Sequence, residues 1–138
     1  MSRLSNAQLK ALDEWLFDYR FIDNKITLRK LELQTDVNVE VDKNVGGGKA
    51  NFVSKVTEEV IVRWDSDREL KGLANFKEAV IATLQLLDKE LTVIFNLRWG
   101  VGSSNTWEEI AYTRHLSRKS IYRKRERILE IFSKKIGM

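Results

Sequence analysis

No proline occurs anywhere in the chain, and over most of its 138 residues the apolar side chains recur every three or four positions. Proline is the strongest interrupter of helices, so its absence permits long ones. Spacing of three and four places apolar side chains on one face of a helix, whereas a strand needs alternation. Apolar residues make up 43% of the composition, which is enough for a core, so we predict an all-α fold.

The N-terminal part, about residues 5–34, has the apolar spacing of an amphipathic helix or of two joined helices. Within it, Leu12, Tyr19, Ile26 and Leu33 recur every seven residues, a repeat that also suits a coiled-coil seam. Packing within the chain and pairing with a second copy in a homodimer are both compatible with this repeat. We therefore predict an N-terminal amphipathic helical arm.

Residues 35–53 break this pattern. Val37, Val39 and Val41 alternate with polar residues, which is a weak signal for a strand. Three consecutive glycines, Gly46 to Gly48, follow and are typical of a mobile linker. We predict a flexible Gly-rich linker over this segment.

A second helical region is expected after the linker. Residues 54–65 predict a helix, and the segment Ser66–Glu69 has the spacing of a capping box that starts the next one. From there the apolar rhythm continues to Ile94, which predicts one long helix of about seven turns. Gly100 then supplies a C-terminal stop.

The segment 106–132 has the sequence of a helix-turn-helix. Thr106 and Glu109 form another capping box at the start of its first helix. Ala111 is the small side chain that two closely crossing helices need at their contact. Ser117 suits the N-cap of the second helix.

Positive charge is concentrated in the same part of the chain. Residues 114–138 hold nine Lys and Arg against two Glu, a net of +7, although the whole chain carries only +4. The remaining residues therefore sum to −3. A basic helix on a mildly acidic body indicates a polyanionic partner, and a helix-turn-helix suits the major groove of double-stranded DNA.

A helical wheel of about 100° per residue separates the faces of the second helix. Ile121, Ile128 and Phe132 form its buried stripe, so the opposite half faces outward. Side chains in the first two turns of the helix, and in the turn before it, are expected to contact base edges or phosphates. The predicted DNA-binding residues are Arg114, Ser117, Arg118, Lys119, Ser120, Tyr122, Arg123 and Arg127.

Arg125 lies near the buried stripe instead, about 40° from its centre. A half-buried guanidinium needs an acceptor, so we predict a structural ion pair with Glu108 or Glu109 on the preceding helix. Packing or turn roles are expected for Tyr112 and His115. The four tryptophans are expected in the core rather than as platforms for stacking bases; they are Trp15, Trp64, Trp99 and Trp107.

The chain lacks the residues that several classes of function need. The chain has no cysteine and a single histidine, so thiolate chemistry and a zinc site are not expected. The sequence shows neither an acidic cluster for a metal nor a nucleophile beside a base. We therefore do not expect an enzyme, a metal or a cofactor. No apolar run reaches about 18 residues and no signal peptide is visible, so we expect a cytoplasmic protein without a membrane span.

Two resemblances extend this interpretation. The segments Leu87–Gly100, Thr106–Ala111 and Ser117–Ile121 look like region 4 of bacterial sigma factors, the module that reads the upstream promoter element. The wider chain resembles the RinA/ArpU-type phage transcriptional regulators. The shared segments are Tyr19–Asp23, Arg29–Leu33, the glycine linker, Ser54–Thr57 and Ser120–Arg125.

The likeness to these regulators implies a sequence-specific activator of phage late genes, for packaging, morphogenesis or lysis. Such a protein is encoded by a phage or prophage of a Gram-positive bacterium and acts in the cytoplasm of the bacterial host cell. Host RNA polymerase is then a further partner, contacted by the N-terminal helix unless that helix pairs two protomers.

The predicted organisation therefore has three parts. Residues 1–34 form the N-terminal helical region for packing or oligomerisation, and residues 35–53 form the linker. Residues 54–138 form a helical DNA-binding domain that ends in a sigma region-4-like helix-turn-helix bundle.

The chain departs from sigma region 4 at Arg125, where sigma factors keep an aliphatic residue on the inner face. It also has no companion region for the other promoter element, which argues against a complete sigma factor. Two alternatives remain beside a transcriptional regulator. One is a phage terminase small subunit, which couples a helix-turn-helix to an oligomerising helix. The other is a protein–protein adaptor whose basic helix faces RNA polymerase.

Overall fold

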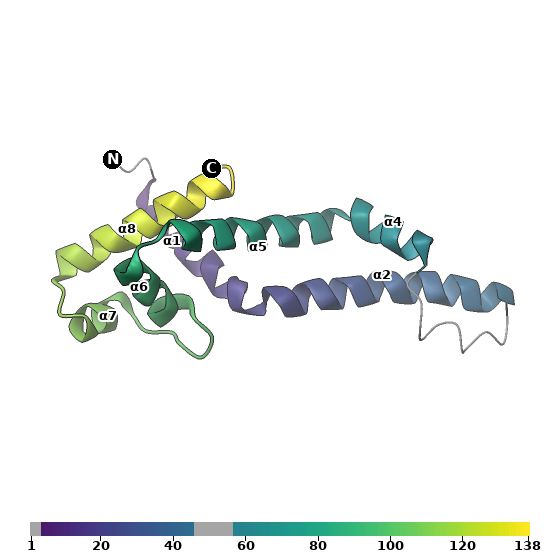
Figure 1. The fold of residues 1–138 in the computed structure, drawn as a ribbon, viewed down its shortest axis with the longest axis horizontal. Coiled ribbons are helices and arrows are strands. Elements are labelled where there is room, and N and C mark those ends of the chain that lie inside the picture. The colour runs from purple at the N-terminus through teal and green to yellow at the C-terminus, as the bar shows by residue number, and fades with distance from the viewer. Residues whose placement is uncertain (1–3, 46–56) are drawn as a thin grey trace. The chain divides into compact units, whose positions relative to one another are not determined.

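The computed structural model of the chain describes residues 4–45 and 57–138, and the surroundings of side chains in 4–35 and 57–138. Every regular element in these ranges is helical, as predicted for an all-α fold (Figure 1). The elements are α1 (Asn6–Leu16), the 3-10 helix η1 (Phe17–Phe21), α2 (Ile22–Val45), α4 (Glu58–Ser66), α5 (Arg68–Leu86), α6 (Lys89–Trp99), α7 (Trp107–Thr113) and α8 (Arg118–Lys135).

The chain forms two compact units, and the first is built from separate parts of the sequence. It contains Met1–Phe21 and Phe76–Met138, whereas the second contains Ile22–Asn75. Helix α5 supplies its first residues to the second unit and the rest to the first. The boundaries therefore differ from the predicted division at residues 34 and 53, because α1 belongs with the C-terminal helices.

The first unit has a core of aliphatic and aromatic side chains from α1, α5, α6, α7 and α8. On α1, Leu9, Leu12 and Leu16 are buried against α8. The rings of Phe95 and Trp99 lie 5.0 Å apart between centroids, and Trp99 in turn contacts Trp107 at 5.4 Å. The remaining buried apolar side chains include Phe76, Val80, Ile94, Ile110, Ala111, Ile121, Ile128, Leu129 and Phe132.

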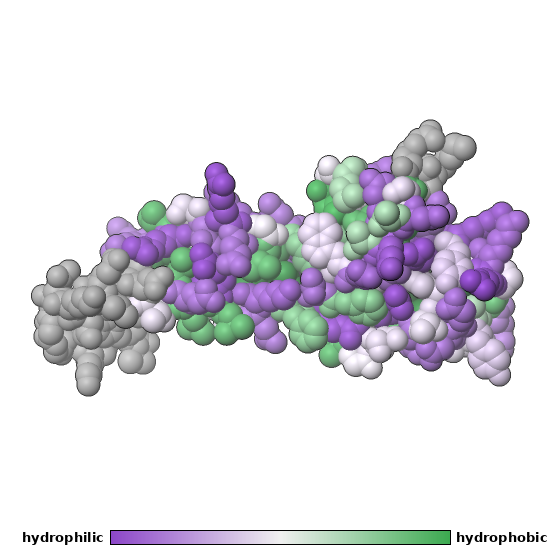
Figure 2. All heavy atoms as spheres, turned by 180° about the vertical axis from the view of Figure 1, so that it is seen from behind, coloured by the Kyte–Doolittle hydropathy of each residue, from purple (hydrophilic) through white to green (hydrophobic). Residues whose placement is uncertain are grey.

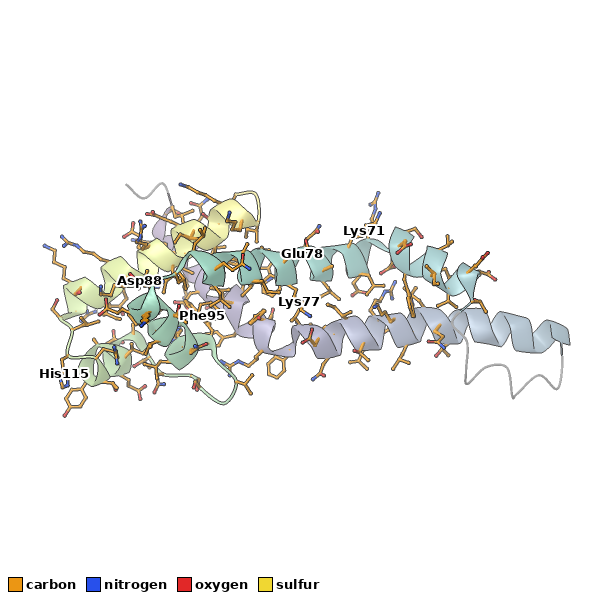
Figure 3. All side chains as sticks on the ribbon, viewed as in Figure 1. Lys71, Lys77, Glu78, Asp88, Phe95 and His115 are labelled. Carbon is orange, nitrogen blue, oxygen red and sulfur yellow. The ribbon has the colours of Figure 1, made fainter. Side chains whose placement is uncertain are left out.

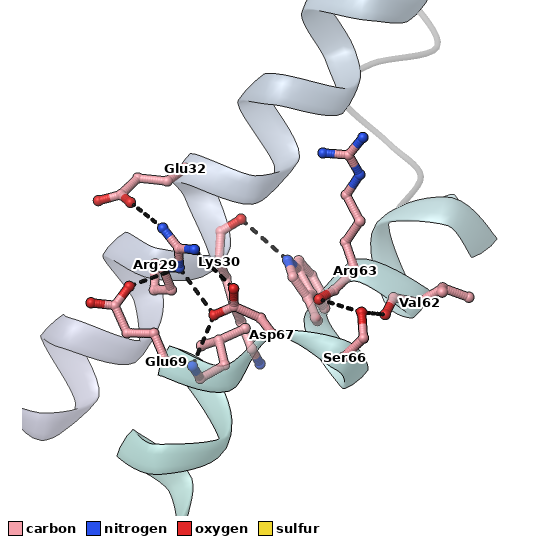
Figure 4. A network of polar contacts seen from close by, with 10 residues as sticks. Arg29, Lys30, Glu32, Val62, Arg63, Ser66, Asp67 and Glu69 are labelled. Carbon is pink, nitrogen blue, oxygen red and sulfur yellow. Dashed lines mark hydrogen bonds and ion pairs between the residues drawn. The ribbon is translucent and has the colours of Figure 1, made fainter.

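The second unit pairs α2 with α4 through a polar network around Arg29 (Figure 4). The guanidinium donates to both carboxylate oxygens of Asp67, at 3.0 and 2.8 Å. It also forms ion pairs with Glu32 and Glu69, at 2.9 and 2.8 Å. The Trp64 indole donates to the main-chain oxygen of Lys30, so two side chains tie the same turn of α2 to α4 and the start of α5.

The predicted strand at residues 37–41 is wrong, because α2 continues as a helix to Val45. Residues 35–45 of the predicted linker are therefore helical. Alternating valines do not exclude a helix when no proline interrupts it, since their β-branched side chains lower helix propensity only slightly. The glycines Gly46 to Gly48 and the start of the predicted helix at 54–65 lie outside the described residues, and the described part of that helix is confirmed as α4.

The predicted helix running to Ile94 is interrupted. Helix α5 ends at Leu86, and Asp88 caps the start of α6 by accepting a hydrogen bond from the Leu91 amide. Figure 3 shows Asp88 at this junction. The predicted capping box at Ser66–Glu69 is also displaced, because the Asp67 carboxylate accepts from the Leu70 amide while Ser66 donates back into α4. Helix α6 ends at Trp99 as predicted.

The seven-residue repeat does not form one continuous seam. Leu12 lies in α1 and Leu33 in α2, and η1 separates the two helices. Both leucines are buried, Leu12 in the first unit and Leu33 in the second, so the repeat packs within the chain. Trp15 departs from the predicted core position: it is 47% exposed, although its ring stacks on Phe76. Among the described helices, none is both long and apolar enough to cross a bilayer.

Candidate nucleic-acid interface

Helix α7 begins as the capping box predicts. The Thr106 hydroxyl accepts from the Glu109 amide at 3.1 Å, and the Glu109 carboxylate accepts from the Thr106 amide at 3.0 Å. Two of the unpaired amides at the helix start are thereby satisfied. Trp107, Ile110 and Ala111 are buried on the inner face, as predicted from their spacing.

A short turn joins α7 to α8. The helix ends at Thr113, and His115 adopts a left-handed backbone conformation with φ of 56°. The Leu116 amide then donates to the Ala111 carbonyl at 2.8 Å, which closes the turn. Ser117 caps α8, since its hydroxyl oxygen accepts from the Ser120 amide at 3.1 Å. The predicted turn role of His115 and the cap at Ser117 are confirmed, and Figure 3 shows His115 in this turn.

The inner face of α8 is the one predicted. Ile121, Ile128 and Phe132 are fully buried, and Leu129 joins them. Because the axial rotation of α8 is set by these side chains, the opposite half of its first turns faces solvent. Figure 2 shows hydrophilic side chains gathered over the end of the first unit where α7 and α8 meet.

Five exposed cations lie on the turn and the outer side of α8, and we call them the basic face: Arg114, Arg118, Lys119, Arg123 and Arg127. None of the five forms an ion pair with another described residue. The Arg118 guanidinium lies 5.8 Å from the centre of the Tyr122 ring. Ser117 is exposed as well, and Ser120 is half-buried.

Not every cation of α8 faces outward. Lys124 forms an ion pair with Glu90 of α6 at 2.6 Å. Arg125 points inward, as predicted, but its partner is Asp13 of α1 and not Glu108 or Glu109. The predicted pairing is therefore wrong. Glu109 is engaged in its capping box, and Asp13 lies closer to the inner face that Arg125 occupies.

Asp13 is the acceptor on which the helices of the first unit converge. One carboxylate oxygen accepts from Arg98 of α6 at 3.0 and 3.1 Å. The other accepts from the Trp107 indole at 2.7 Å and from Arg125 at 3.0 Å. The main-chain oxygen of Asp13 accepts from the Trp99 indole at 2.9 Å. A single buried carboxylate on α1 therefore ties together α6, α7 and α8.

Burial strengthens the hydrogen bonds that the Asp13 carboxylate accepts. Its two basic partners are both largely shielded from water, and hydrogen bonds to charged groups are stronger in such surroundings. Arg98 is held further by the rings of Phe17 and Trp107, whose centres lie 4.8 and 5.2 Å from its guanidinium carbon. The sequence carried a signal for this role, because Asp13 falls between Leu9 and Leu16 on the apolar face of α1.

Tyr122 has a structural contact of its own. Its hydroxyl donates to the Glu108 carboxylate at 2.6 Å, which ties the second turn of α8 to the start of α7. This hydrogen bond lowers the pKa of Glu108 and raises the pKa of Tyr122. The Tyr122 ring also lies between Arg118 and Arg125, at 5.8 Å from each guanidinium. Of the predicted DNA-binding residues, Tyr122 is thus the one whose hydroxyl proton is already donated to another side chain.

Tyr112, for which a packing or turn role was expected, does not pack in the core, but its main-chain oxygen accepts from the His115 amide in the turn. Its side chain is 86% exposed, and it lies at the end of α7 directly before the turn. A helical wheel contains the signal, because Tyr112 lies about 140° from Trp107 and therefore off the buried stripe. An exposed aromatic ring beside Arg114 adds a flat apolar surface to the edge of the basic face.

This arrangement can bind an anion by charge, by hydroxyl donation and through the free amides at the start of α8. Helix N-termini attract phosphate because their first amides lack partners within the helix. Ser117 uses an oxygen lone pair for its cap, so its hydroxyl proton is still available to a phosphate. Among the residues that the structure describes, no group of three His, Asp or Glu side chains is placed to hold a metal ion.

Comparison with known proteins places the chain in a family but not beside a characterised relative. No curated protein matches it with significance, and neither does any solved structure. A family model described as "Protein of unknown function (DUF722)" matches residues 8–134, which include every helix from α2 to α7 and nearly all of α1 and α8. The chain therefore belongs to the DUF722 family.

Proposed function

We propose that this protein is a sequence-specific, double-stranded DNA-binding transcriptional regulator. The observation that carries the proposal is the division of cations on α8. Lys124 and Arg125 are paired with carboxylates of the fold, whereas the basic face remains exposed and largely without ion pairs. A helix that is anchored on one side and cationic on the other suits insertion into a major groove about 12 Å wide.

The parts of the basic face have different proposed roles. Lys119 and Arg123 lie on the outer side of the first two turns of α8, so they approach base edges. Arg114 in the turn and Arg127 in the third turn flank them and contact phosphates. Ser117 and Ser120 donate to phosphate at the helix N-terminus. Arg118 is held near Tyr122 and reaches a flanking phosphate.

The biological setting rests on the sequence resemblance. The likeness to RinA/ArpU-type regulators supports activation of phage late genes in the cytoplasm of a bacterial host, together with host RNA polymerase. A helix of this length reads only a few base pairs, so selectivity requires a second reader on the DNA or help from polymerase.

The first test is selection of a binding site from random duplexes, followed by mobility shifts at several salt concentrations. We expect a selected sequence and an affinity that falls steeply as salt rises, because phosphate contacts release counterions. A protein–protein adaptor would give no shift at moderate salt. A terminase small subunit would select a packaging start rather than a promoter.

The variant Arg123→Ala tests the reading role. On the selected site we expect a loss of about 1–3 kcal/mol in binding free energy together with relaxed sequence preference. The control is Lys134→Ala, which removes an exposed cation from the last turn of α8 and should change binding little. An equal loss of affinity for Arg123→Ala on every duplex would reduce Arg123 to a phosphate contact. No loss at all would contradict the proposed interface.

A further inference from the structure

Helix α2 has a second stripe on the side opposite its buried face. In its described part, Ile22, Ile26, Arg29 and Leu33 lie on the side that packs against α4 and α5, and they are buried or half-buried. Asn24, Leu28, Leu31 and Thr35 are exposed, and their steps of four, three and four place them on one line along the helix. We call these four residues the outer seam.

The outer seam is apolar at its centre and uncharged throughout. Leu28 is 60% exposed and Leu31 is 51% exposed. Their neighbours along the seam, Asn24 and Thr35, are polar but neutral. A third of the residues in this chain are charged, so an uncharged line along a solvent-facing helix differs from an ordinary solvated face.

We propose that the outer seam binds a second copy of this chain, with the two α2 helices antiparallel. Steps of three and four are the spacing by which paired helices interlock their side chains. A two-fold axis between Leu28 and Leu31 would place Leu28 of each copy against Leu31 of the other. Asn24 would then face Thr35, so the seam is complementary to itself, which is the condition for a two-fold interface.

Charge at the edge of the seam favours the antiparallel arrangement. Lys25 and Glu32 lie at the same edge, two turns apart. In an antiparallel pair this edge meets the same edge of the partner, which brings Lys25 of one copy toward Glu32 of the other, whose carboxylate also pairs with Arg29 of its own chain. In a parallel pair the edge would meet the opposite one, where Thr27 and Gln34 carry no charge.

The pairing would have a clear consequence for DNA recognition. Two copies joined through α2 carry two α8 helices, so one assembly can read two half-sites. The inference itself does not depend on DNA binding. Its tests contain no DNA, so its failure and a failure of the proposed function can be told apart.

The first test measures the mass of the full-length protein over a range of concentrations by sedimentation equilibrium. We expect a reversible monomer–dimer equilibrium. Leu28→Lys should raise the dissociation constant roughly tenfold or more, because the seam would then have to desolvate an ammonium group. The matched control is Val62→Lys on α4, whose side chain is 63% exposed and lies outside the seam. It should leave the dissociation constant unchanged.

The second test uses the absence of cysteine from the chain. In Asn24→Cys and Thr35→Cys the new thiols lie at the two ends of the seam. An antiparallel pair brings Cys at position 24 of one copy to position 35 of the other, within the reach of a disulfide. We expect a disulfide-linked dimer when the two variants are mixed and oxidised. Neither variant alone should cross-link efficiently.

Three results would overturn the proposal. A monomer at every concentration would show that this seam does not bind a second copy, and binding of another protein there would not rescue it. Equal effects of Leu28→Lys and Val62→Lys would move the dimer contact elsewhere. Efficient cross-linking of each cysteine variant with itself would make the pair parallel. Circular dichroism of each variant verifies that helix content is retained.

Discussion

Asp13 shows how much of the basic face depends on one side chain that lies far from it in the sequence. Asp13 is 3% exposed, and its carboxylate accepts hydrogen bonds from three side chains on three different helices. A buried charge is tolerated only when partners satisfy it. Removing the Asp13 charge would therefore leave its buried donors without an acceptor. Arg125 in particular would be left half-buried without an acceptor, directly behind the exposed cations of α8.

Asp13→Asn should therefore destabilise the first unit. The amide keeps the shape of the carboxylate but brings an N–H₂ group toward the donors of Trp107 or Arg125. We expect a loss of about 3–5 kcal/mol in the free energy of unfolding, measured by urea denaturation. Glu14→Gln on the exposed side of α1 is the control and should change it by less than about 0.5 kcal/mol. If Asp13→Asn matched this control, Asp13 would not hold the helices together.

The helix boundaries are determined by capping side chains and not by the apolar spacing. The apolar rhythm continues through Leu84, Leu87 and Leu91 without a change of step, so it cannot detect the end of α5. The break is made by Asp88, whose side chain caps α6 through the Leu91 amide at 2.8 Å. Asp67 acts in the same way before α5, and it also ties that helix start to α2 through Arg29.

The tie between Arg29 and Asp67 predicts a pH dependence of stability. The hydrogen bonds from Arg29, and secondarily the Leu70 amide, lower the pKa of Asp67 from its ordinary 3.8 to about 2. A carboxylate whose pKa is lower in the folded state stabilises the fold above its unfolded pKa. This stabilisation is lost as protons bind to the folded form. The contribution should therefore be fully present above about pH 4 and disappear as the pH falls toward 2.

Carboxyl NMR titration of Asp67 in the full-length protein measures this directly. We expect a midpoint well below the ordinary value in the unaltered chain and a return toward it in Arg29→Gln. Glu32→Gln is the control, because it removes another partner of Arg29 and leaves the Arg29–Asp67 hydrogen bonds in place. A midpoint near 3.8 in the unaltered chain would show that the tie does not persist in solution.

The first unit is discontinuous in sequence, so its stability depends on a segment that precedes the other unit. Leu9, Leu12 and Leu16 of α1 are buried in the same core as α8. Removing α1 would expose this core and would also remove Asp13. The basic face and the helix that anchors it are therefore parts of one folding unit, although most of the chain lies between them.

A fragment of residues 54–138, the DNA-binding domain predicted from sequence, should consequently fail to unfold cooperatively on heating. Each buried leucine that it lacks is worth about 2–5 kcal/mol, so the sum exceeds the stability of a typical small domain. Thermal unfolding followed by circular dichroism compares the fragment with the full-length protein. Leu12→Ala in the full chain is an intermediate case and should lower the midpoint without abolishing cooperativity. A fragment as stable as the full chain would contradict the role of α1.

Much of the region around the candidate site followed from sequence alone, because its causes act within a few residues. The capping box at Thr106, the cap at Ser117 and the buried stripe from Ile121 to Phe132 depend on backbone amides and on helical spacing. The same local rules placed the basic face on the outer side of α8. The all-α character of the described chain follows from the absence of proline and from the apolar rhythm.

Packing between distant segments decided the rest. The partner of Arg125 lies 112 positions away, and no local spacing relates Asp13 to it. Only the approach of α1 to α6, α7 and α8 brings one carboxylate within reach of donors from all three helices. Residue spacing shows that a half-buried guanidinium needs an acceptor, but the acceptor itself is chosen by which helices lie side by side.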